Sequence, residues 1–275
     1  PEMTAHATAP ARITGLGFIT PIGNDATRLS ALISGEIDFV QDPAPRDIVC
    51  RGTLDEVQQY FHERSWSDGL PFVPPTMDRI AAFLRFTQRD PEELIGVLGV
   101  ANRNLTVWNV AVNGVMAGCR PEYMPVLLAA AEVMTDPSFK IEDAGATPGW
   151  EPVLTLSGPL ARELGFHNGQ GLARIGHQAN SSVGRFLRLI FRNIAGYTHG
   201  PEGADKGSIG MNFMVALSEN EEACEQLGWP TYAQDRGFST EDNVVTIQSV
   251  VAVSPPTYSG SRTDDPEEHA ALLAD

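Results

Sequence analysis

The sequence predicts a mixed α/β fold in which helices cover a layered sheet, and it leaves an α+β arrangement open. Short runs of β-branched residues alternate with segments whose apolar residues recur at helical spacing, which is typical of layered domains. The 42% hydrophobic and 20% charged residues are usual for a globular protein, and 275 residues suffice for a substantial core. We divide the chain into an N-terminal segment at 1–45, a main α/β domain at 46–256 and a polar tail at 257–275.

The N-terminal segment predicts one strand and one helix. Residues 12–23, RITGLGFITPIG, suit a short strand that runs into a glycine turn, and residues 24–36 have helical spacing. Further on, Thr53 and Glu56 have the spacing of a capping box ahead of an amphipathic helix.

A proline-rich loop follows at residues 66–76, WSDGLPFVPPT. Its three prolines fix the backbone and remove hydrogen-bond donors, so we expect a rigid loop of the kind that often lines sites. The other interpretation is that this loop only connects the helices on either side of it. Thr76 then caps a helix over 77–86, and Asp90–Pro91 predicts the start of another short helix.

The middle of the chain carries the most apolar segments. Residues 105–118, LTVWNVAVNGVMAG, predict a buried helix, and Pro121 opens the next one, which runs to Met134. The apolar run Val153–Leu156 predicts a buried strand that turns into a short helix. Residues 177–196, HQANSSVGRFLRLIFRNIAG, give the clearest amphipathic helix of the second half.

Two further strands are predicted near the C-terminus. Residues 209–223 suit a strand that ends in a capping box of Ser218 with Glu221. Residues 242–254, DNVVTIQSVVAVS, are β-branched and predict a strand.

Charge and cysteine usage exclude several classes of function. A net charge of −16 disfavours nucleic acid and anionic membrane surfaces as partners, because both require a basic footprint. The three cysteines have neither disulfide nor zinc-ligand spacing, so a reducing cytoplasm is expected. No stretch is long and apolar enough for a membrane span, and no motif identifies a cofactor, which stays unknown.

Cys119 is the candidate nucleophile. It stands one residue outside the helix that Pro121 opens, where backbone N–H groups and the helix dipole would stabilise a thiolate. Arg120 adds a positive neighbour, and Gly114 and Gly118 would let backbone or substrate approach closely. The other interpretation is an inert buried residue, because free cysteine is among the most buried residue types.

His177 is the candidate base for this thiol, since it lies at the start of the long helix after two glycine turns. His167 and His199 lie in similar glycine-rich loops and are weaker candidates. His177, His199 and Glu219 could also gather around a metal, but their spacing is not a ligand motif, so no metal is predicted.

Polar residues that could contact a substrate complete the predicted site. Arg185 shares a helical face with Arg188 and Arg192, which could bind an anion or pair with neighbouring carboxylates. The other candidates for substrate binding, some with capping roles as alternatives, are Arg120, Asn113, Asp68, Asn180 and Glu219.

Residues 11–39, ARITGLGFITPIGNDATRLSALISGEIDF, resemble the opening strand, glycine turn and first helix of the β-ketoacyl synthases of the thiolase fold. That family catalyses condensation with a cysteine in a small-residue elbow and two histidines in their own motifs. These motifs are not found in this chain.

Five blocks between residues 54 and 256 resemble a bacterial family that is associated with small redox-type proteins bearing a Sec/Cys-Gly-Ser-Cys motif, the UGSC family. The blocks are WSDGLPFVPPT, VNGVMAGCRPEYMPVLLAA, GWEPVLTLSGP, GRFLRLIFRNIAG and DRGFSTEDNVVTIQSV. The resemblance implies thiol or selenol chemistry with a partner subunit, although this chain has no Cys-Gly-Ser-Cys motif of its own.

Two classes of function follow from these observations. The first is an intracellular enzyme of the oxidoreductase, lyase or acyl-transfer type, in which Cys119 acts on a small organic or acyl-thioester substrate. The second is a non-catalytic subunit or binding protein that partners a redox or acyl-thioester enzyme. The long apolar helices are compatible with a homodimer.

Overall fold

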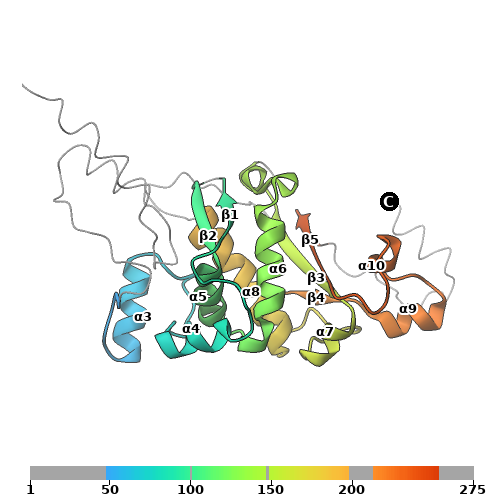
Figure 1. Cartoon of the computed structure of the whole chain (residues 1–275), viewed down its shortest axis with the longest axis horizontal. Coiled ribbons are helices and arrows are strands. Elements are labelled where there is room, and N and C mark those ends of the chain that lie inside the picture. Colours follow the sequence, from blue (N-terminus) through green and yellow to red (C-terminus); the bar gives the residue numbers. More distant parts are fainter. Residues whose placement is uncertain (1–47, 100, 147–148, 198–212, 254–275) are drawn as a thin grey trace, which may run out of the picture.

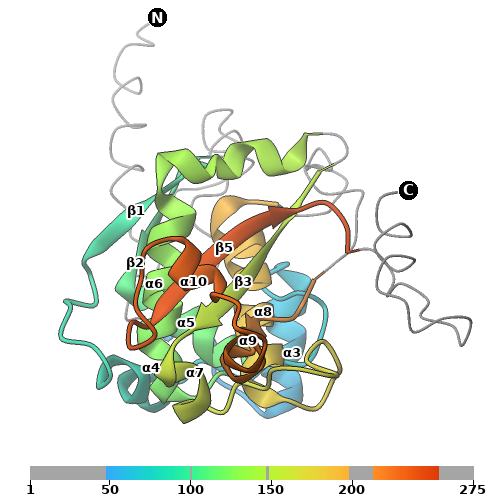
Figure 2. The same ribbon diagram turned by 90° about the vertical axis from the view of Figure 1, so that its right-hand side faces the viewer.

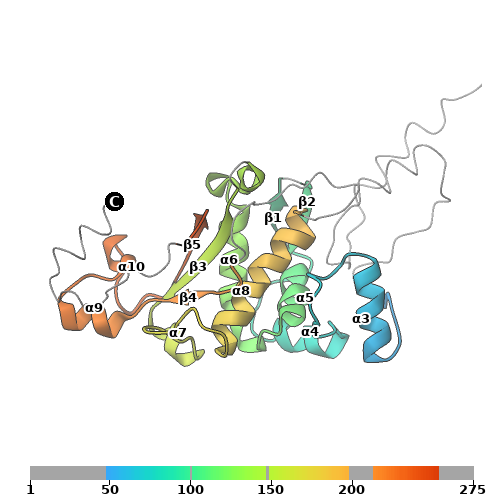
Figure 3. The same ribbon diagram turned by 180° about the vertical axis from the view of Figure 1, so that it is seen from behind.

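The computed structural model describes residues 48–99, 101–146, 149–197 and 213–253. Helices and two small sheets of mixed strand direction confirm the predicted mixed α/β class. The helices α4 and α5 lie on one side of α6 and α8, and the three-stranded sheet lies on the other side (Figure 1). The view from behind shows α8 alongside both α5 and α6 (Figure 3).

Helix α5 (Val107–Ala117) is the centre of the molecule, because all of its residues are buried. It begins at a capping box in which Thr106 and Asn109 satisfy each other's backbone N–H groups. It ends at Gly118, whose positive φ of 80° suits the left-handed C-cap. The buried helix predicted from residues 105–118 is thus confirmed.

Three helices surround α5: α4 (Met77–Leu84), α6 (Met124–Thr135) and α8 (Gln178–Ile190). A Cβ atom at Gly114 would lie 2.7 Å from Leu127 Cδ1 and 2.8 Å from Phe83 Cε1, which is closer than real contacts. The sequence left open whether Gly114 admits a close approach of protein or of substrate, and the structure shows that it serves the packing of neighbouring helices.

The central strand of the main sheet is β3 (Glu151–Ser157), which is buried along nearly its whole length. It pairs in parallel with β4 (Leu217–Ser218) and antiparallel with β5 (Val244–Val250). Leu154 is opposite Ile247 in this register, and both belong to the core beneath α6 and α8. The buried strand predicted at Val153–Leu156 and the strand predicted at 242–254 are confirmed.

A hairpin replaces the short helix predicted to begin at Asp90–Pro91, so that prediction is wrong. Strand β1 (Leu94–Leu98) pairs antiparallel with β2 (Arg103–Thr106). The Asp90 carboxylate accepts the Glu92 N–H at 2.8 Å, which closes a turn, and the β-branched residues after it find strand partners.

The capping box predicted for Ser218 with Glu221 is also wrong. The N-cap of α9 (Glu221–Leu227) is Asn220, which accepts the Ala223 N–H, while Glu221 accepts the Gly158 N–H at 2.5 Å. The chain then forms the short α10 (Tyr232–Asp235) before it enters β5.

The remaining elements agree with the sequence in type. The capping box of Thr53 with Glu56 opens α3 (Leu54–Glu63), and Thr76 stands at the N-cap of α4 without a side-chain hydrogen bond. Helix α7 (Pro159–Glu163) follows β3, and a π-helical turn, Phe191–Ala195, continues α8. Short 3-10 turns complete the list, at Pro121–Tyr123, Pro137–Phe139 and Ile141–Gly145.

The strand and helix predicted within 12–36, the C-terminal tail and both domain boundaries lie outside the described residues. Within the described ranges, none of the helices combines the length and hydropathy that crossing a lipid bilayer requires.

The close approach of α8 to the segment before β4 predicts that Gly184 tolerates no side chain. A Cβ atom at Gly184 would overlap the backbone of Met214 and Val215. We expect Gly184→Ala to lower the free energy of unfolding by about 2 kcal/mol or more, measured by urea denaturation. Gly99→Ala is the control, because its nearest atom would be at 3.6 Å, and a change within about 0.5 kcal/mol is expected there. Equal free energies of unfolding for the two variants would contradict the close packing of α8 at Gly184 against the segment before β4.

Candidate functional site

The proline-rich loop is attached to α8 by a two-pronged ion pair. Arg185 Nε lies 2.8 Å from Asp68 Oδ2, and Arg185 Nη2 lies 2.8 Å from Asp68 Oδ1. The two side chains are only 16% and 8% exposed, and Arg185 also donates to the Leu70 carbonyl. Both residues were predicted to contact substrate, and the structure does bring them together. They satisfy each other, which is the pairing that the sequence left open for this arginine.

Cys119 lies beside this ion pair, in the turn that joins α5 to α6. Its backbone N–H donates to the Gly114 carbonyl at 3.0 Å, so Cys119 belongs to the C-terminal cap of α5. The end of a helix presents carbonyl groups and partial negative charge, which disfavour a thiolate. The 3-10 turn that Pro121 opens lies between Cys119 and α6. Cys119 does stand one residue before the N-cap of the segment that Pro121 opens, as predicted, but that segment is a 3-10 turn and α6 begins only at Met124.

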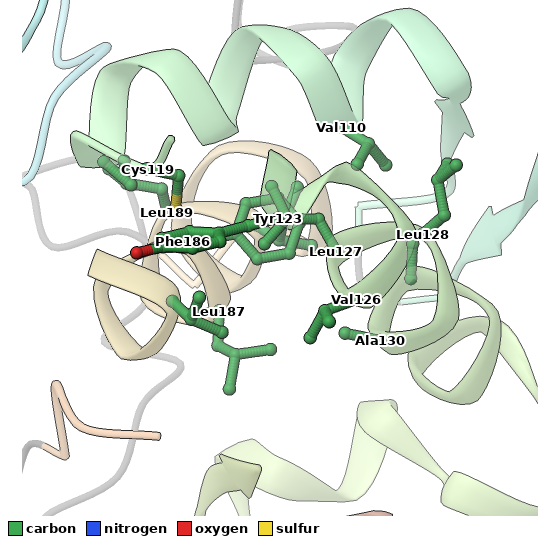
Figure 4. Packing of buried hydrophobic residues seen from close by; sticks show 14 of the residues in the cluster. Val110, Cys119, Tyr123, Val126, Leu127, Leu128, Ala130, Phe186, Leu187 and Leu189 are labelled. Atoms are coloured by element: carbon green, nitrogen blue, oxygen red, sulfur yellow. The ribbon is translucent and has the colours of Figure 1, made fainter. Parts of the chain in front are cut away.

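Burial decides the protonation state of this thiol. Cys119 is 8% exposed and belongs to the apolar core, where it is drawn with Tyr123, Phe186 and Leu189 (Figure 4). Loss of solvation raises the pKa of Cys119 to about 12. Two weaker effects act in the opposite direction, the Ser182 hydroxyl and the positive charge of Arg185.

The Ser182 hydroxyl does not change this outcome. It is buried and stabilises the thiolate, but its geometry falls short of a well-formed hydrogen bond. A pKa this high favours the neutral thiol at physiological pH, so the activated nucleophile stays a prediction that the environment of Cys119 does not support.

His177 is the N-cap of α8, and its ring stacks on His167 with 3.9 Å between ring centroids and 8° between planes. No hydrogen bond joins the His177 ring to Cys119 among the described residues. The next residue of α8, Gln178, donates a hydrogen bond to the Gly118 carbonyl at 3.3 Å.

The predicted asparagines are structural. Asn113 is fully buried, donates to the Asn109 carbonyl and accepts from Asn193 at 2.9 Å. Asn180 is also fully buried, and its amide bonds the backbone of His167 and Ala216. These hydrogen bonds connect segments of the core, and they leave neither side chain open to a substrate.

Arg120 and Glu219 are engaged elsewhere. Arg120 donates to the Leu164 carbonyl at 2.9 Å, and its guanidinium lies 4.9 Å from the centre of the Tyr123 ring. Glu219 accepts the Ser157 hydroxyl at 2.5 Å and the backbone N–H groups of Tyr232 and Ala233, so it holds the start of α10.

A second feature, which sequence reasoning did not find, is an apolar cavity of about 230 Å³. It lies between the segment at 48–50, the proline-rich loop and the helices α3, α4 and α5. Its walls are mainly aliphatic and aromatic, and they include Ile48, Val57, Phe61, Ile80, Trp108 and Val112.

The proline-rich loop forms one wall of this cavity with Pro74, Pro75 and Thr76. The amide of Gln58 on α3 bonds both the Phe72 carbonyl, at 2.6 Å, and the Phe72 N–H, at 3.3 Å. These two hydrogen bonds fix the distance between the loop and α3, so the cavity between them is a defined feature of the fold.

Cys50 and Thr76 are among the residues that line the cavity, and its described lining carries no ionised side chain. The sequence does show the apolar spacing of α3 and the three prolines of the loop. Neither feature indicates that α3 and the loop leave a cavity between them.

Among the described residues, no three His, Cys, Asp or Glu side chains gather in a metal-binding arrangement. Comparison of the chain with protein-family models, curated proteins and solved structures finds no match. The resemblances to β-ketoacyl synthases and to the UGSC-associated family therefore stay predictions.

The raised pKa predicts that Cys119 is unreactive in the folded protein. At pH 7 to 9, we expect iodoacetamide to modify the half-buried Cys50 and Cys224 while Cys119 reacts only after denaturant is added. Peptide mapping by mass spectrometry measures the three rates. Rapid modification of Cys119 in the native protein, with a midpoint below the ordinary thiol value of 9.0, would restore the nucleophile hypothesis.

The Asp68–Arg185 pair predicts strong coupling between the two positions. Arg185→Ala leaves a nearly buried carboxylate unpaired, so we expect the free energy of unfolding to fall by about 3 kcal/mol. The Asp68→Ala/Arg185→Ala double variant should lose no more than that, because neither charge is then left alone. Arg162→Ala, at an exposed position on α7, controls for loss of a positive charge. Additive single effects would show that the pair is not coupled.

Proposed function

We propose that the protein is a binding protein that holds a small, uncharged, apolar molecule in the cavity between α3, α4 and α5. The cavity is the observation that carries this proposal, because its walls are mainly apolar and include the polar residues Cys50 and Thr76. Small-molecule sites usually have this composition. This function belongs to the second class that the sequence predicts, a non-catalytic subunit or binding protein.

The size and charge of the cavity define the class of ligand. A volume of about 230 Å³ has room for roughly eight water-sized groups at about 30 Å³ each, which suits a short acyl chain or a single aromatic ring. A carboxylate would lose its hydration without gaining a cation, since the described lining has none. The net charge of −16 also opposes anions at long range.

Thiol chemistry at Cys119 has less support, because burial holds the pKa of that thiol at about 12. Cys50 is the thiol that a ligand in the cavity would contact. We keep the reducing cytoplasm as the proposed compartment, since all three cysteines are free. A partner enzyme with redox or acyl-thioester chemistry remains part of this proposal.

The proposal predicts that ligands protect Cys50 from alkylation. With 1-octanol as the probe, we expect slower modification of Cys50 by iodoacetamide as the alcohol concentration rises, because the ligand covers the thiol. Cys224 on α9 is the internal control, since it is half-buried and outside the cavity lining. Octanoate should protect at least tenfold less well, by the desolvation cost of its charge.

A filled cavity should abolish this protection. Val57→Phe places a ring in the cavity, whereas Val133→Phe makes the same change at a half-buried helical position outside it. We expect 1-octanol to protect Cys50 in Val133→Phe and not in Val57→Phe. Equal protection of Cys50 and Cys224, or no effect of Val57→Phe, would contradict a ligand site in this cavity.

A further inference from the structure

The cavity between α3, α4 and α5 has an open end at the start of α4. Thr76 and Met77 belong to its lining, and both residues are exposed, Met77 by 45%. Thr76 is polar, and its side chain makes no capping hydrogen bond to α4. A ligand can enter beside these two residues, and a polar end of that ligand would keep its contact with water there.

The opposite end of the cavity is closed, because α4 and α5 come together there. Ile80 lies one turn beyond Met77 on the same face of α4, and Ile80 and Val112 of α5 are each only 2% exposed. Farther along the same helices, a Cβ atom at Gly114 would lie 2.8 Å from Phe83 Cε1, so the Phe83 ring fills the space between them. Ile80 and Val112 are therefore the last lining residues before the two helices meet.

The residues that determine which ligand fits are confined to one part of the molecule. Figure 2, viewed from the side of β3 and β5, shows α3 behind the strands of the main sheet. The described lining comes from the segment at 48–50, α3, the proline-rich loop, α4 and α5, and it includes neither Cys119 nor a residue of the sheet. The length and shape of the ligand thus depend on how these helices pack.

We infer that the cavity binds an unbranched chain with one uncharged polar end, and that Ile80 and Val112 limit the length of this chain. The inference rests on the proposed function, because it names the ligand class of the same cavity. The apolar end of the chain lies against Ile80 and Val112, where a polar group would lose its hydration without a hydrogen-bond partner. The polar end stays near Thr76, at the open end.

The convergence of α4 and α5 favours a chain over a ring. Both residues at the closed end are β-branched, and they come from two helices that approach each other beyond this point. The space therefore narrows toward Ile80 and Val112, which admits the end of an unbranched chain more easily than a ring or a branched end.

The test measures how strongly unbranched alcohols, from 1-pentanol to 1-undecanol, protect Cys50 of the full chain from iodoacetamide. Each added carbon that enters the cavity should lower the half-protecting alcohol concentration by about fourfold. Once the chain reaches Ile80 and Val112, further carbons stay in water and should give no further decrease. From the cavity volume of about 230 Å³, we expect this break at a length of roughly eight carbons.

Variants at the closed end should move the break. Val112→Ala removes two methyl groups, so we expect the break at a chain about two carbons longer. Val115→Ala is the matched control, because Val115 is on the same helix and also 2% exposed but lies outside the described lining, so its break should not move. Ile80→Val is a milder truncation that should move the break by about one carbon, and it decides the question if Val112→Ala does not fold.

The outcomes separate this inference from the proposed function. If no alcohol protects Cys50 of the unmodified chain, the proposed function fails, and the inference fails with it. If alcohols protect Cys50 but the half-protecting concentration shows no break, the ligand site stands and the length limit is overturned. The same conclusion follows if the break stays in place in Val112→Ala and Ile80→Val, or if Val115→Ala moves it equally.

Discussion

The burial of α5 on all sides is the constraint on which the rest of the structure depends. A helix whose every residue is buried needs apolar neighbours all round, and its own polar groups must be satisfied inside the protein. The helices α4, α6 and α8 provide those neighbours, and the β1–β2 hairpin adds to them. The three-stranded sheet then covers the far side of α6 and α8 (Figure 1). The architecture is therefore organised around a helix, and its sheets are small.

The same constraint explains why polar residues that suggest catalysis turn out to be structural. Where α5 ends, the chain reverses beneath α8 and the proline-rich loop, so the polar groups there have little contact with water. Asp68 and Arg185 neutralise each other, and Asn113 binds Asn193. Cys119 is held neutral by the same loss of solvation. A polar residue near a buried helix end is usually needed to satisfy the fold before it is available for a reaction.

The cavity beside α5 is not governed by this requirement, and the proposed function depends on it. The cavity lies against the first half of α5, where Trp108 and Val112 face the proline-rich loop across unfilled space.

The sequence by itself determined those helices and strands whose periodicity and capping residues lie within one segment of the chain. The buried α5, the amphipathic α8, the strands β3 and β5 and the capping box at Thr53 follow from periodicity and capping residues. The hairpin of β1 with β2 did not follow, because the pairing of Leu94–Leu98 with Arg103–Thr106 overrode a local signal for a helix start at Asp90–Pro91. Only the tertiary structure decided which polar side chains meet, that Cys119 caps α5, and where packing leaves a cavity. The solvation of a side chain and the contacts that it makes depend on residues far apart in the chain. The spacing of residues within one segment therefore cannot predict them.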